Sequence, residues 1–220
     1  MNFIYIILWV SIIVLLYILF SVYKNSNNTI NENYLKNSIS PIALNSLYNY
    51  QSKSYAYEIW IYAIDLSNAG TSGQVGSTNN PNGNIFSITN VLSLDMYNDG
   101  SLYVSTYGTS SYDTRYQVTK TVDLHRWQQV IISVNNQIID IYLNGKLIKS
   151  SNDSVSTPGS NATISFGRPD VYIAKFNRLD GVMDTNKAWK RYMNGNIGLI
   201  PMNVDLTLMK NNVSSKFPIL

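Results

Sequence analysis

One stretch of sequence, residues 122–150, decides the fold, and it reads VDLHRWQQVIISVNNQIIDIYLNGKLIKS. Three runs rich in apolar and β-branched residues follow one another in it: Trp127 to Val134, Ile138 to Leu143 and Lys146 to Lys149. The pairs Asn135-Asn136 and Asn144-Gly145 separate these runs, and such Asn-containing pairs favour the two-residue turns of β-hairpins. The stretch therefore predicts three neighbouring antiparallel strands.

Strand signals continue on both sides of this meander. Tyr57 to Ile64 is a β-branched and aromatic run that is apolar on both faces, as in a central strand of a sandwich. Further strands are predicted at residues 85–88, 91–97, 102–104, 164–167 and 171–176, with a closing strand through Val204, Leu206 and Leu208. One short helix is predicted at 184–193, because Asp184 or Thr185 can cap its start and Gly195 follows its end.

These segments also resemble the laminin-G-like, concanavalin-A-like jelly roll. In that family a Trp enters a core strand after a short turn, and a hairpin then ends in a Tyr-x-(Asn/Asp)-Gly-Lys turn. The matching positions here are Trp127, Tyr142, Asn144, Gly145 and Lys146. Trp60 stands where the family has an early Trp, and residues 170–195 look like its late strand and short helix. The resemblance covers Ser54 to Gly195 and implies two antiparallel sheets packed face to face, with rim loops and a concave face for ligands.

Four residues are expected to anchor the core of this sandwich: Trp60, Trp127, Tyr142 and Gly145. Tryptophans in apolar strands are usually buried, and each large side chain contributes roughly 1.5–3 kcal/mol when it leaves water. The alternative for the two tryptophans is that their rings stack on a sugar.

The N-terminus carries an uncharged apolar run, Phe3 to Val22. A helix of about 20 residues matches the hydrocarbon thickness of a bilayer, and no basic n-region or small-residue cleavage site indicates a signal peptide. We therefore predict a retained transmembrane anchor over residues 1–23, a polar tether over 24–53 and the jelly-roll domain over 54–220. Lys24 and Lys36 after the anchor favour a cytosol-facing or capsid-facing domain. The sequons at Asn27, Asn152, Asn161 and Asn212 count little against this orientation in so Asn-rich a chain.

Composition narrows the function. Charged residues make up only 13% of the chain, tyrosine occurs 17 times and cysteine is absent, so disulfides and thiolate chemistry are excluded. The net charge of +3 is small and dispersed, which argues against nucleic-acid binding. The Asn-, Ile- and Tyr-rich composition with an N-terminal anchor looks like that of membrane-associated virion proteins of large DNA viruses.

No catalytic constellation is visible, so the chain is predicted not to be an enzyme. Glycoside cleavage needs two neighbouring carboxyl groups, but the chain has two glutamates, and neither has an acidic partner along a strand: Glu32 lies in the tether and Glu58 in the early strand. His125 is the only histidine. Asp123 lies two residues away, yet no nucleophile motif accompanies the pair, and an exposed turn residue is the favoured interpretation.

No cofactor is predicted, although calcium is an open alternative. Jelly rolls of the resembling family often bind calcium at the rim through hard oxygen ligands. Asp95, Asn98 and Asp99 form a candidate cluster, and Asp153 or Asp170 are candidate loop ligands. The favoured alternative is that Asn98-Asp99-Gly100 forms an ordinary turn.

Two functions follow from the sequence. The favoured one is a membrane-anchored, non-enzymatic interaction or structural protein, such as a minor virion component that links a membrane to capsid proteins. The alternative is a glycan-binding, lectin-like module whose rim loops hold the ligand, with or without calcium.

Overall fold

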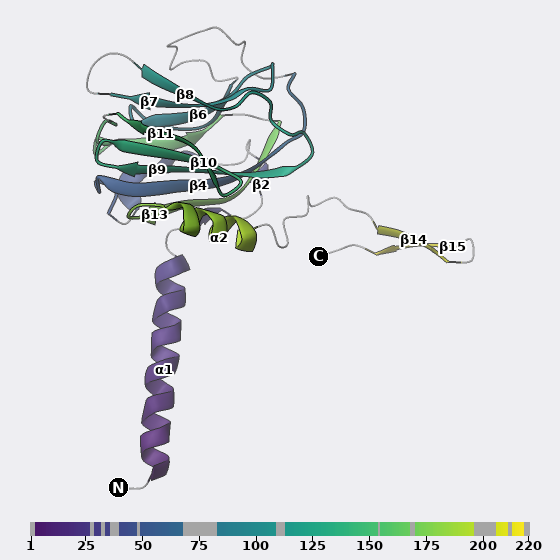
Figure 1. Cartoon of the computed structure of the whole chain (residues 1–220). Coiled ribbons are helices and arrows are strands. Elements are labelled where there is room, and N and C mark those ends of the chain that lie inside the picture. The colour runs from purple at the N-terminus through teal and green to yellow at the C-terminus, as the bar shows by residue number, and fades with distance from the viewer. Residues whose placement is uncertain are drawn as a thin grey trace.

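The structure is a computed structural model of the whole chain (Figure 1). It describes residues 3–26, 29–31, 34–35, 40–47, 49–67, 83–108, 113–153, 155–167, 170–195, 206–210 and 213–217. The helices are α1 (Phe3–Ser26) and α2 (Thr185–Gly195), and a 3-10 helix spans Leu44–Ser46. The strands are β1 (Thr29–Asn31), β2 (Tyr34–Leu35), β3 (Ile42–Ala43), β4 (Ser54–Ala63), β5 (Asn84–Ile88), β6 (Leu92–Met96), β7 (Leu102–Tyr107), β8 (Asp113–Thr119), β9 (Trp127–Asn135), β10 (Ile138–Leu143), β11 (Lys146–Asn152), β12 (Thr163–Phe166), β13 (Val171–Asp180), β14 (Leu206–Lys210) and β15 (Val213–Phe217).

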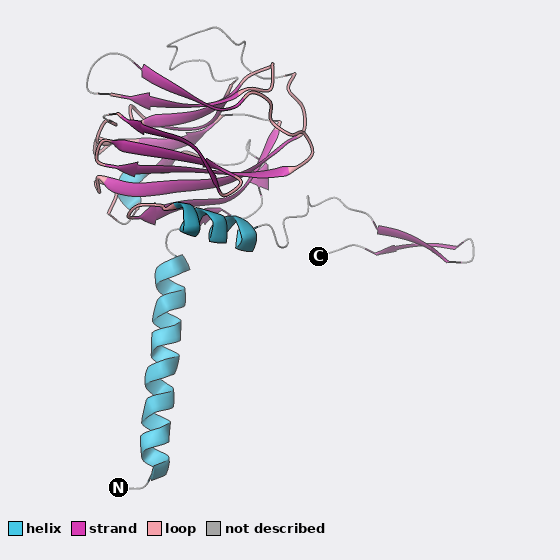
Figure 2. Cartoon of the chain, viewed as in Figure 1, coloured by secondary structure: helices cyan, strands magenta, loops and turns pink. Residues whose placement is uncertain are grey.

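Two antiparallel sheets form a sandwich, as the sequence predicts (Figure 2). The first, which we call sheet A, has the order β1-β13-β4-β9-β10-β11, and β2 also pairs with β13. The second, sheet B, has the order β3-β12-β5-β6-β7-β8. Neighbouring strands are far apart in the chain at β4–β9 and β13–β4, which is the long-range connectivity of a jelly roll.

The predicted meander is confirmed as β9, β10 and β11. Ile138 pairs with Asn135 across the first turn, and Leu143 pairs with Lys146 across the second. Asn136 has φ 55°, Asn144 has φ 49° and Gly145 has φ 75°, so both turns use left-handed residues. Asn and Gly adopt this region at low cost, which explains why these residues occupy the turns.

The main core lies between the sheets. Tyr57 of β4 and Phe176 of β13 stack with ring centroids 5.9 Å apart, and Phe86 of β5 meets Phe176 edge-on at 5.1 Å. Alternate residues of β9, including Val130 and Ile132, complete this layer with less than 1% of their surface exposed. The strand period of two therefore directs one face of each strand inward.

Three parts of the secondary structure differ from the prediction. β1, β2 and β3 lie within the range predicted as a tether, where they pair with β13 and β12 and extend both sheets. The strand predicted to close the sandwich at its C-terminal end is instead β14, which pairs with β15 in a separate two-stranded sheet. The sequence analysis did not predict β8. Most residues of this strand are polar, and Tyr116 and Val118 are its residues in the core cluster, so its apolar signal is weak.

The apolar N-terminal run forms a helix, α1, which extends away from the sandwich in Figure 1. Its described side chains are Tyr5 and those of residues 8–19, and all of them are exposed. Within the part of the chain that the structure describes, no helix is both long and apolar enough to cross a membrane. The structure thus confirms a helix over this run but does not show the predicted membrane span.

The predicted short helix is confirmed as α2, which covers the outer face of sheet A (Figure 1). Asp184 caps it: its carboxylate accepts a hydrogen bond from the Lys187 backbone N–H at 2.8 Å. These bonds to the helix start hold the pKa of Asp184 below its usual value of 3.8. On the inner side of α2, Ala188 is fully buried against the sheet.

Candidate functional site

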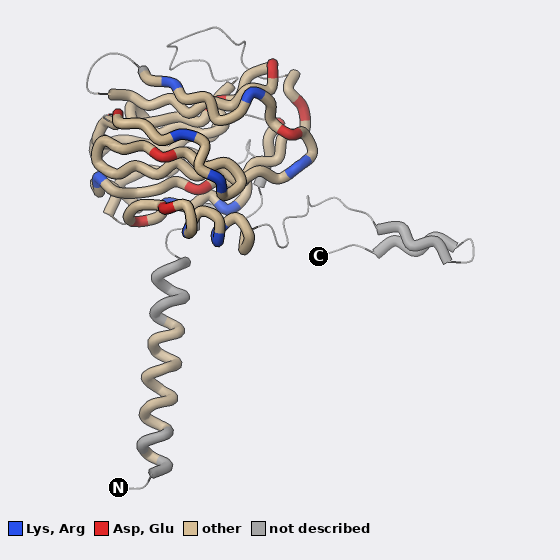
Figure 3. Tube along the Cα trace, viewed as in Figure 1, with Lys and Arg blue, Asp and Glu red and all other residues tan. Residues whose placement is uncertain are grey.

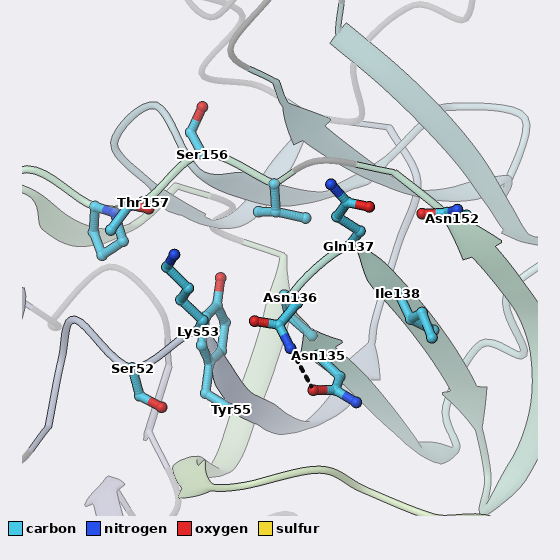
Figure 4. Close-up of a pocket in the computed structure, with 13 residues that line it drawn as sticks. Ser52, Lys53, Tyr55, Asn135, Asn136, Gln137, Ile138, Asn152, Ser156 and Thr157 are labelled. Carbon is cyan, nitrogen blue, oxygen red and sulfur yellow. Dashed lines mark hydrogen bonds between the residues drawn. The ribbon is translucent and has the colours of Figure 1, made fainter.

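A pocket of 550 Å³ opens at one rim of the sandwich (Figure 4). We call it the rim pocket. It is formed where the start of β4, the β9–β10 turn and the segment after β11 meet. Its lining is Ser52, Lys53, Tyr55, Val134, Asn135, Asn136, Gln137, Ile138, Asn152, Val155, Ser156, Thr157 and Pro158. A volume of this size is typical of small-molecule sites, which occupy about 300–1,000 Å³.

Hydrogen bonds fix the walls of the rim pocket to one another. The Asn136 backbone N–H donates to the Lys53 carbonyl oxygen at 2.8 Å, and the Asn135 side-chain oxygen accepts from the Ser54 hydroxyl at 2.9 Å. On the opposite side, the Asp153 backbone N–H donates to the Gln137 carbonyl oxygen at 2.6 Å. The β9–β10 turn is thereby held against both neighbouring segments, and the pocket has a preformed shape.

Tyr55 lies at the floor of the rim pocket and is only 4% exposed. Its ring meets Tyr57 edge-on at 5.5 Å, and the Arg178 guanidinium lies 5.3 Å from the ring centre. Burial, and next the nearby Tyr57, raise the pKa of Tyr55 well above its usual value of 10.0. The phenol therefore stays protonated at neutral pH and can donate a hydrogen bond to a ligand.

The walls of the rim pocket carry polar groups that the protein itself does not use. In the described part of the chain, the side chains of Gln137, Asn152 and Thr157 have no hydrogen-bond partner. An amide offers two donors and an acceptor, and a hydroxyl offers one donor and two acceptor lone pairs. Such a set matches the vicinal hydroxyl groups of a sugar.

A second polar site lies on the outer face of sheet A, beneath α2. We call it the Glu58 cluster: Glu58, Gln129, Asn177 and Arg191. Glu58 is 3% exposed, and its carboxylate accepts hydrogen bonds from the Gln129 amide at 2.6 Å and from the Asn177 amide at 3.2 Å. Arg191 of α2 donates to the same carboxylate through Nε at 2.8 Å and through a second guanidinium nitrogen. All carboxylate oxygens are thus engaged, and the cluster ties α2 to the sheet.

The predicted core anchors lie in a second apolar layer, between sheet A and α2. Trp60 is fully buried, but its ring stacks on Tyr192 of α2 at 5.8 Å with an interplanar angle of 7°. Trp127 is half-buried and packs against Trp60. Because residues alternate along β4 and β9, the inward positions are the neighbours of these tryptophans.

The other two anchors also serve the docking of α2. The Tyr142 hydroxyl donates to the Met183 carbonyl oxygen at 3.0 Å, and Tyr142 is 2% exposed. Gly145 lies under the helix, where an added Cβ would stand 2.9 Å from Tyr192 Cβ and 3.0 Å from Trp189 Cα. Only glycine fits this approach.

The calcium candidates are placed in two different settings. Asp95 of β6 accepts hydrogen bonds from Ser93 at 2.7 Å and Ser105 at 3.2 Å, and burial raises the pKa of its carboxyl group. Asn98 and Asp99 are exposed, and Asp99 accepts from the Ser101 backbone N–H at 2.9 Å, as a turn residue does. Among the described residues, no group of three His, Cys, Asp or Glu side chains could hold a metal ion.

The remaining candidates also have local partners. The Asp153 carboxylate accepts from Thr106 at 2.8 Å and from Tyr116 at 3.0 Å, so it turns away from the rim pocket. Asp170 is buried at the start of β13. The calcium site stays a prediction.

His125 is an exposed turn residue, as predicted, with φ 56°. Asp123 faces Arg126 at 3.7 Å, and the His125 ring contacts Tyr62 at 6.3 Å between centroids. Lys, Arg, Asp and Glu are scattered over the face of the sandwich drawn in Figure 3.

The sequence predicted rim loops as the place for a ligand but did not identify the rim pocket. Its lining comes from three segments that are far apart in the chain, so spacing along the sequence could not reveal it. The one local signal was the run Asn135-Asn136-Gln137, three consecutive amides at a hairpin turn.

The fold and the rim pocket together define a two-sheet jelly roll with a preformed polar hollow at its edge. Residues 37–196 match the family model Laminin G 3, described as the concanavalin A-like lectin/glucanases superfamily. The chain belongs to this family. No curated protein sequence matches the chain.

Several solved structures share the fold. The binding domain of botulinum neurotoxin DC in complex with SialylT is 18% identical over 73% of this chain and 39% of that chain, with a TM-score of 0.51. The same domain in complex with rat synaptotagmin II covers 74% and 40%, at 18% identity and a TM-score of 0.52. The binding domain of paraclostridial mosquitocidal protein 1 is 12% identical over 74% and 47%, with a TM-score of 0.53. The chain thus spans less than half the length of these structures, and the likeness concerns the fold.

Proposed function

We propose that the protein is a lectin-like module that binds a saccharide in the rim pocket. The observation that carries this proposal is the set of unused amide and hydroxyl groups on the walls of a preformed pocket above the buried Tyr55. Unpaired donors and acceptors in a hollow of this size discriminate a ligand rich in hydroxyl groups. Membership of a lectin-containing superfamily supports the same ligand class.

The solved relatives support a binding role in general. One similar binding domain was solved with SialylT and with rat synaptotagmin II in separate structures, and this chain matches 39% and 40% of the length of those structures. Between a saccharide and a protein as the occupant of the rim pocket, the pocket favours the saccharide. It is concave, and most of its lining residues carry an amide or a hydroxyl group, whereas the centres of protein interfaces are more apolar.

The proposal includes binding without catalysis. The described lining of the rim pocket holds no carboxylate, and glycoside cleavage by the usual route needs two carboxyl groups about 5–9.5 Å apart. The Glu58 carboxylate is engaged by four donor groups beneath α2. We expect an oligosaccharide panel to be recovered intact after incubation with the protein. Released reducing ends that Glu58→Gln abolishes would contradict this part of the proposal.

Anchoring of the module in a membrane by residues 3–22 is a further part of the proposal. The sequence supports it, since the run is uncharged and about as long as a bilayer is thick. The exposure of every described side chain of α1 supports it too, because an apolar surface of this kind requires lipid or a protein partner. Two residues separate α1 from β1, so such an anchor would hold the sandwich close to the membrane.

Sealed vesicles that carry the full chain test the anchor and its orientation. We expect the chain to stay with the vesicles in alkaline carbonate, and protease to show which side the sandwich faces. Release by carbonate would overturn the anchor. The role as a virion component that links a membrane to capsid proteins stays a prediction from composition, which cross-linking in intact particles would test.

A glycan array tests the saccharide proposal. The full chain is compared with two variants. The pocket variant is Gln137→Ala/Asn152→Ala, and the control is Asn186→Ala, which removes an exposed amide of α2 that does not line the rim pocket. We expect saturable binding that the pocket variant loses and the control keeps. Repeating the array with a chelator shows whether calcium contributes. Binding that the pocket variant retains in full would contradict the proposed site.

A further inference from the structure

The charged residues that line the rim pocket bear on the charge of its ligand. Among the described residues of its lining, Lys53 is the only charged one, and it is exposed. In the described part of the chain, the Lys53 ammonium group has no ion pair and no hydrogen bond. A cation without a counter-ion at the mouth of a pocket raises the local concentration of anions.

One acidic residue, Asp153, follows the pocket residue Asn152 in the chain. Its carboxylate accepts hydrogen bonds from Thr106 at 2.8 Å and from Tyr116 at 3.0 Å. In the described part of the chain it forms no ion pair with Lys53. The described lining of the rim pocket therefore carries one positive charge and no negative charge.

Lys53 and Tyr55 can act on one ligand group. Tyr55 is the second residue of β4, and Lys53 is the residue directly before this strand. Figure 4 shows the Lys53 ammonium group and the Tyr55 hydroxyl pointing toward the same part of the pocket, near Ser156 and Thr157. Because burial raises the pKa of Tyr55, its hydroxyl keeps its proton and donates. An ammonium donor beside a phenol donor suits an acidic oxygen group.

We propose that the saccharide bound in the rim pocket is anionic, with a carboxylate or sulfate group held by Lys53 and Tyr55. This inference rests on the proposed function and adds the ligand class. The amides of Gln137 and Asn152 then contact the hydroxyl groups of the same sugar. A neutral saccharide would leave the ammonium group of Lys53 unpaired and would bind more weakly.

Titration calorimetry of the full chain tests the inference. The probes are lactose, sialyllactose as the carboxylate-bearing form, and a sulfated disaccharide. We expect one or both anionic probes to bind about two- to fivefold tighter than lactose, the range of a single exposed ion pair. Raising the salt concentration from about 0.1 M to about 1 M, which shortens the Debye length from about 10 to about 3 Å, should remove this preference.

Matched variants separate the inference from the proposed function. Lys53→Gln should abolish the preference for anionic probes over lactose, whereas Lys190→Gln, which changes an exposed lysine of α2, should keep that preference. Equal affinity for neutral and anionic probes, or a preference that Lys53→Gln retains, would overturn the inference alone if Gln137→Ala/Asn152→Ala still abolishes binding. Absence of binding by every probe would count against both.

Discussion

The rim pocket and the Glu58 cluster are both polar, yet they differ in how their polar groups are used. In the Glu58 cluster both carboxylate oxygens are bonded beneath α2, although the side-chain oxygen of Gln129 is buried without a partner among the described residues. In the rim pocket, amides and hydroxyls face an open hollow. Buried polar groups are paired because an unpaired one costs about 1–3 kcal/mol. The comparison therefore indicates that the paired carboxylate serves stability, and it leaves the exposed polar groups of the rim pocket available for the proposed ligand.

Removal of the Glu58 carboxylate should give the largest change in stability. Glu58→Ala removes an acceptor of the buried Gln129 and Asn177 amides, at about 1–3 kcal/mol for each, while the Arg191 side chain is 37% exposed and can bond to water. We expect the free energy of unfolding, measured with urea, to fall by about the sum of these two amide costs. A loss below about 1 kcal/mol would contradict this comparison, because the Glu58 cluster would then contribute little to the stability of the fold.

The close approach of α2 to the β10–β11 turn gives the next effect. Gly145→Ala must place a methyl group 2.9 Å from Tyr192 Cβ while keeping φ at 75°. Left-handed backbone and overpacking together cost about 2–4 kcal/mol. Gly159→Ala is the matched control, since no atom lies within 4 Å of its Cβ position, and it should change stability by less than about 1 kcal/mol. Equal effects at the two glycines would contradict the docking of α2 described above.

The cap of α2 gives a smaller effect that depends on pH. The pKa of Asp184 is lowered in the folded protein, so its contribution to stability is complete above the unfolded value of 3.8 and is lost as the pH falls through the folded value. Asp184→Asn keeps an N-cap acceptor but does not titrate. Urea unfolding between pH 5 and pH 3 should therefore show a steeper loss of stability in the wild type than in this variant. Parallel pH profiles would contradict the assignment of the cap.

The rim pocket should give the smallest change in stability. Gln137 is exposed and bonds to nothing through its side chain in the described part of the chain. Gln137→Ala should change the free energy of unfolding by less than about 0.5 kcal/mol, while it weakens saccharide binding. Thermal unfolding and a binding titration on the same sample measure both. A large loss of stability would mean that the pocket wall is structural after all.

Much of the fold was predictable from local signals. The predicted turns are confirmed, with left-handed residues at Asn136, Asn144 and Gly145, although the first turn lies one residue later than the predicted pair Asn135-Asn136. The helix near Asp184 was also predictable, because its cap involves only a few neighbouring residues. The likeness to the laminin-G-like jelly roll is now matched by a family model that covers residues 37–196.

The layer in which an aromatic residue lies was not predictable. Trp60 and Trp127 could be buried on either face of their strands. Their place beneath α2 depends on the fact that α2 covers the outer face of sheet A, which the sequence does not reveal. The same holds for β1 to β3, whose polar residues read as a tether until their pairing with β13 and β12 is known. The rim pocket depends on which distant segments meet, so only the three-dimensional fold reveals it.

A structure of the full chain with a bound oligosaccharide tests the central claim most directly. The oligosaccharide that binds best on the array is added, and the position of its sugar rings is determined. We predict that a sugar ring occupies the rim pocket, with hydrogen bonds to Gln137 and Asn152 and with Tyr55 beneath it. A sugar bound elsewhere on the sandwich, with the rim pocket holding only water, would contradict the account.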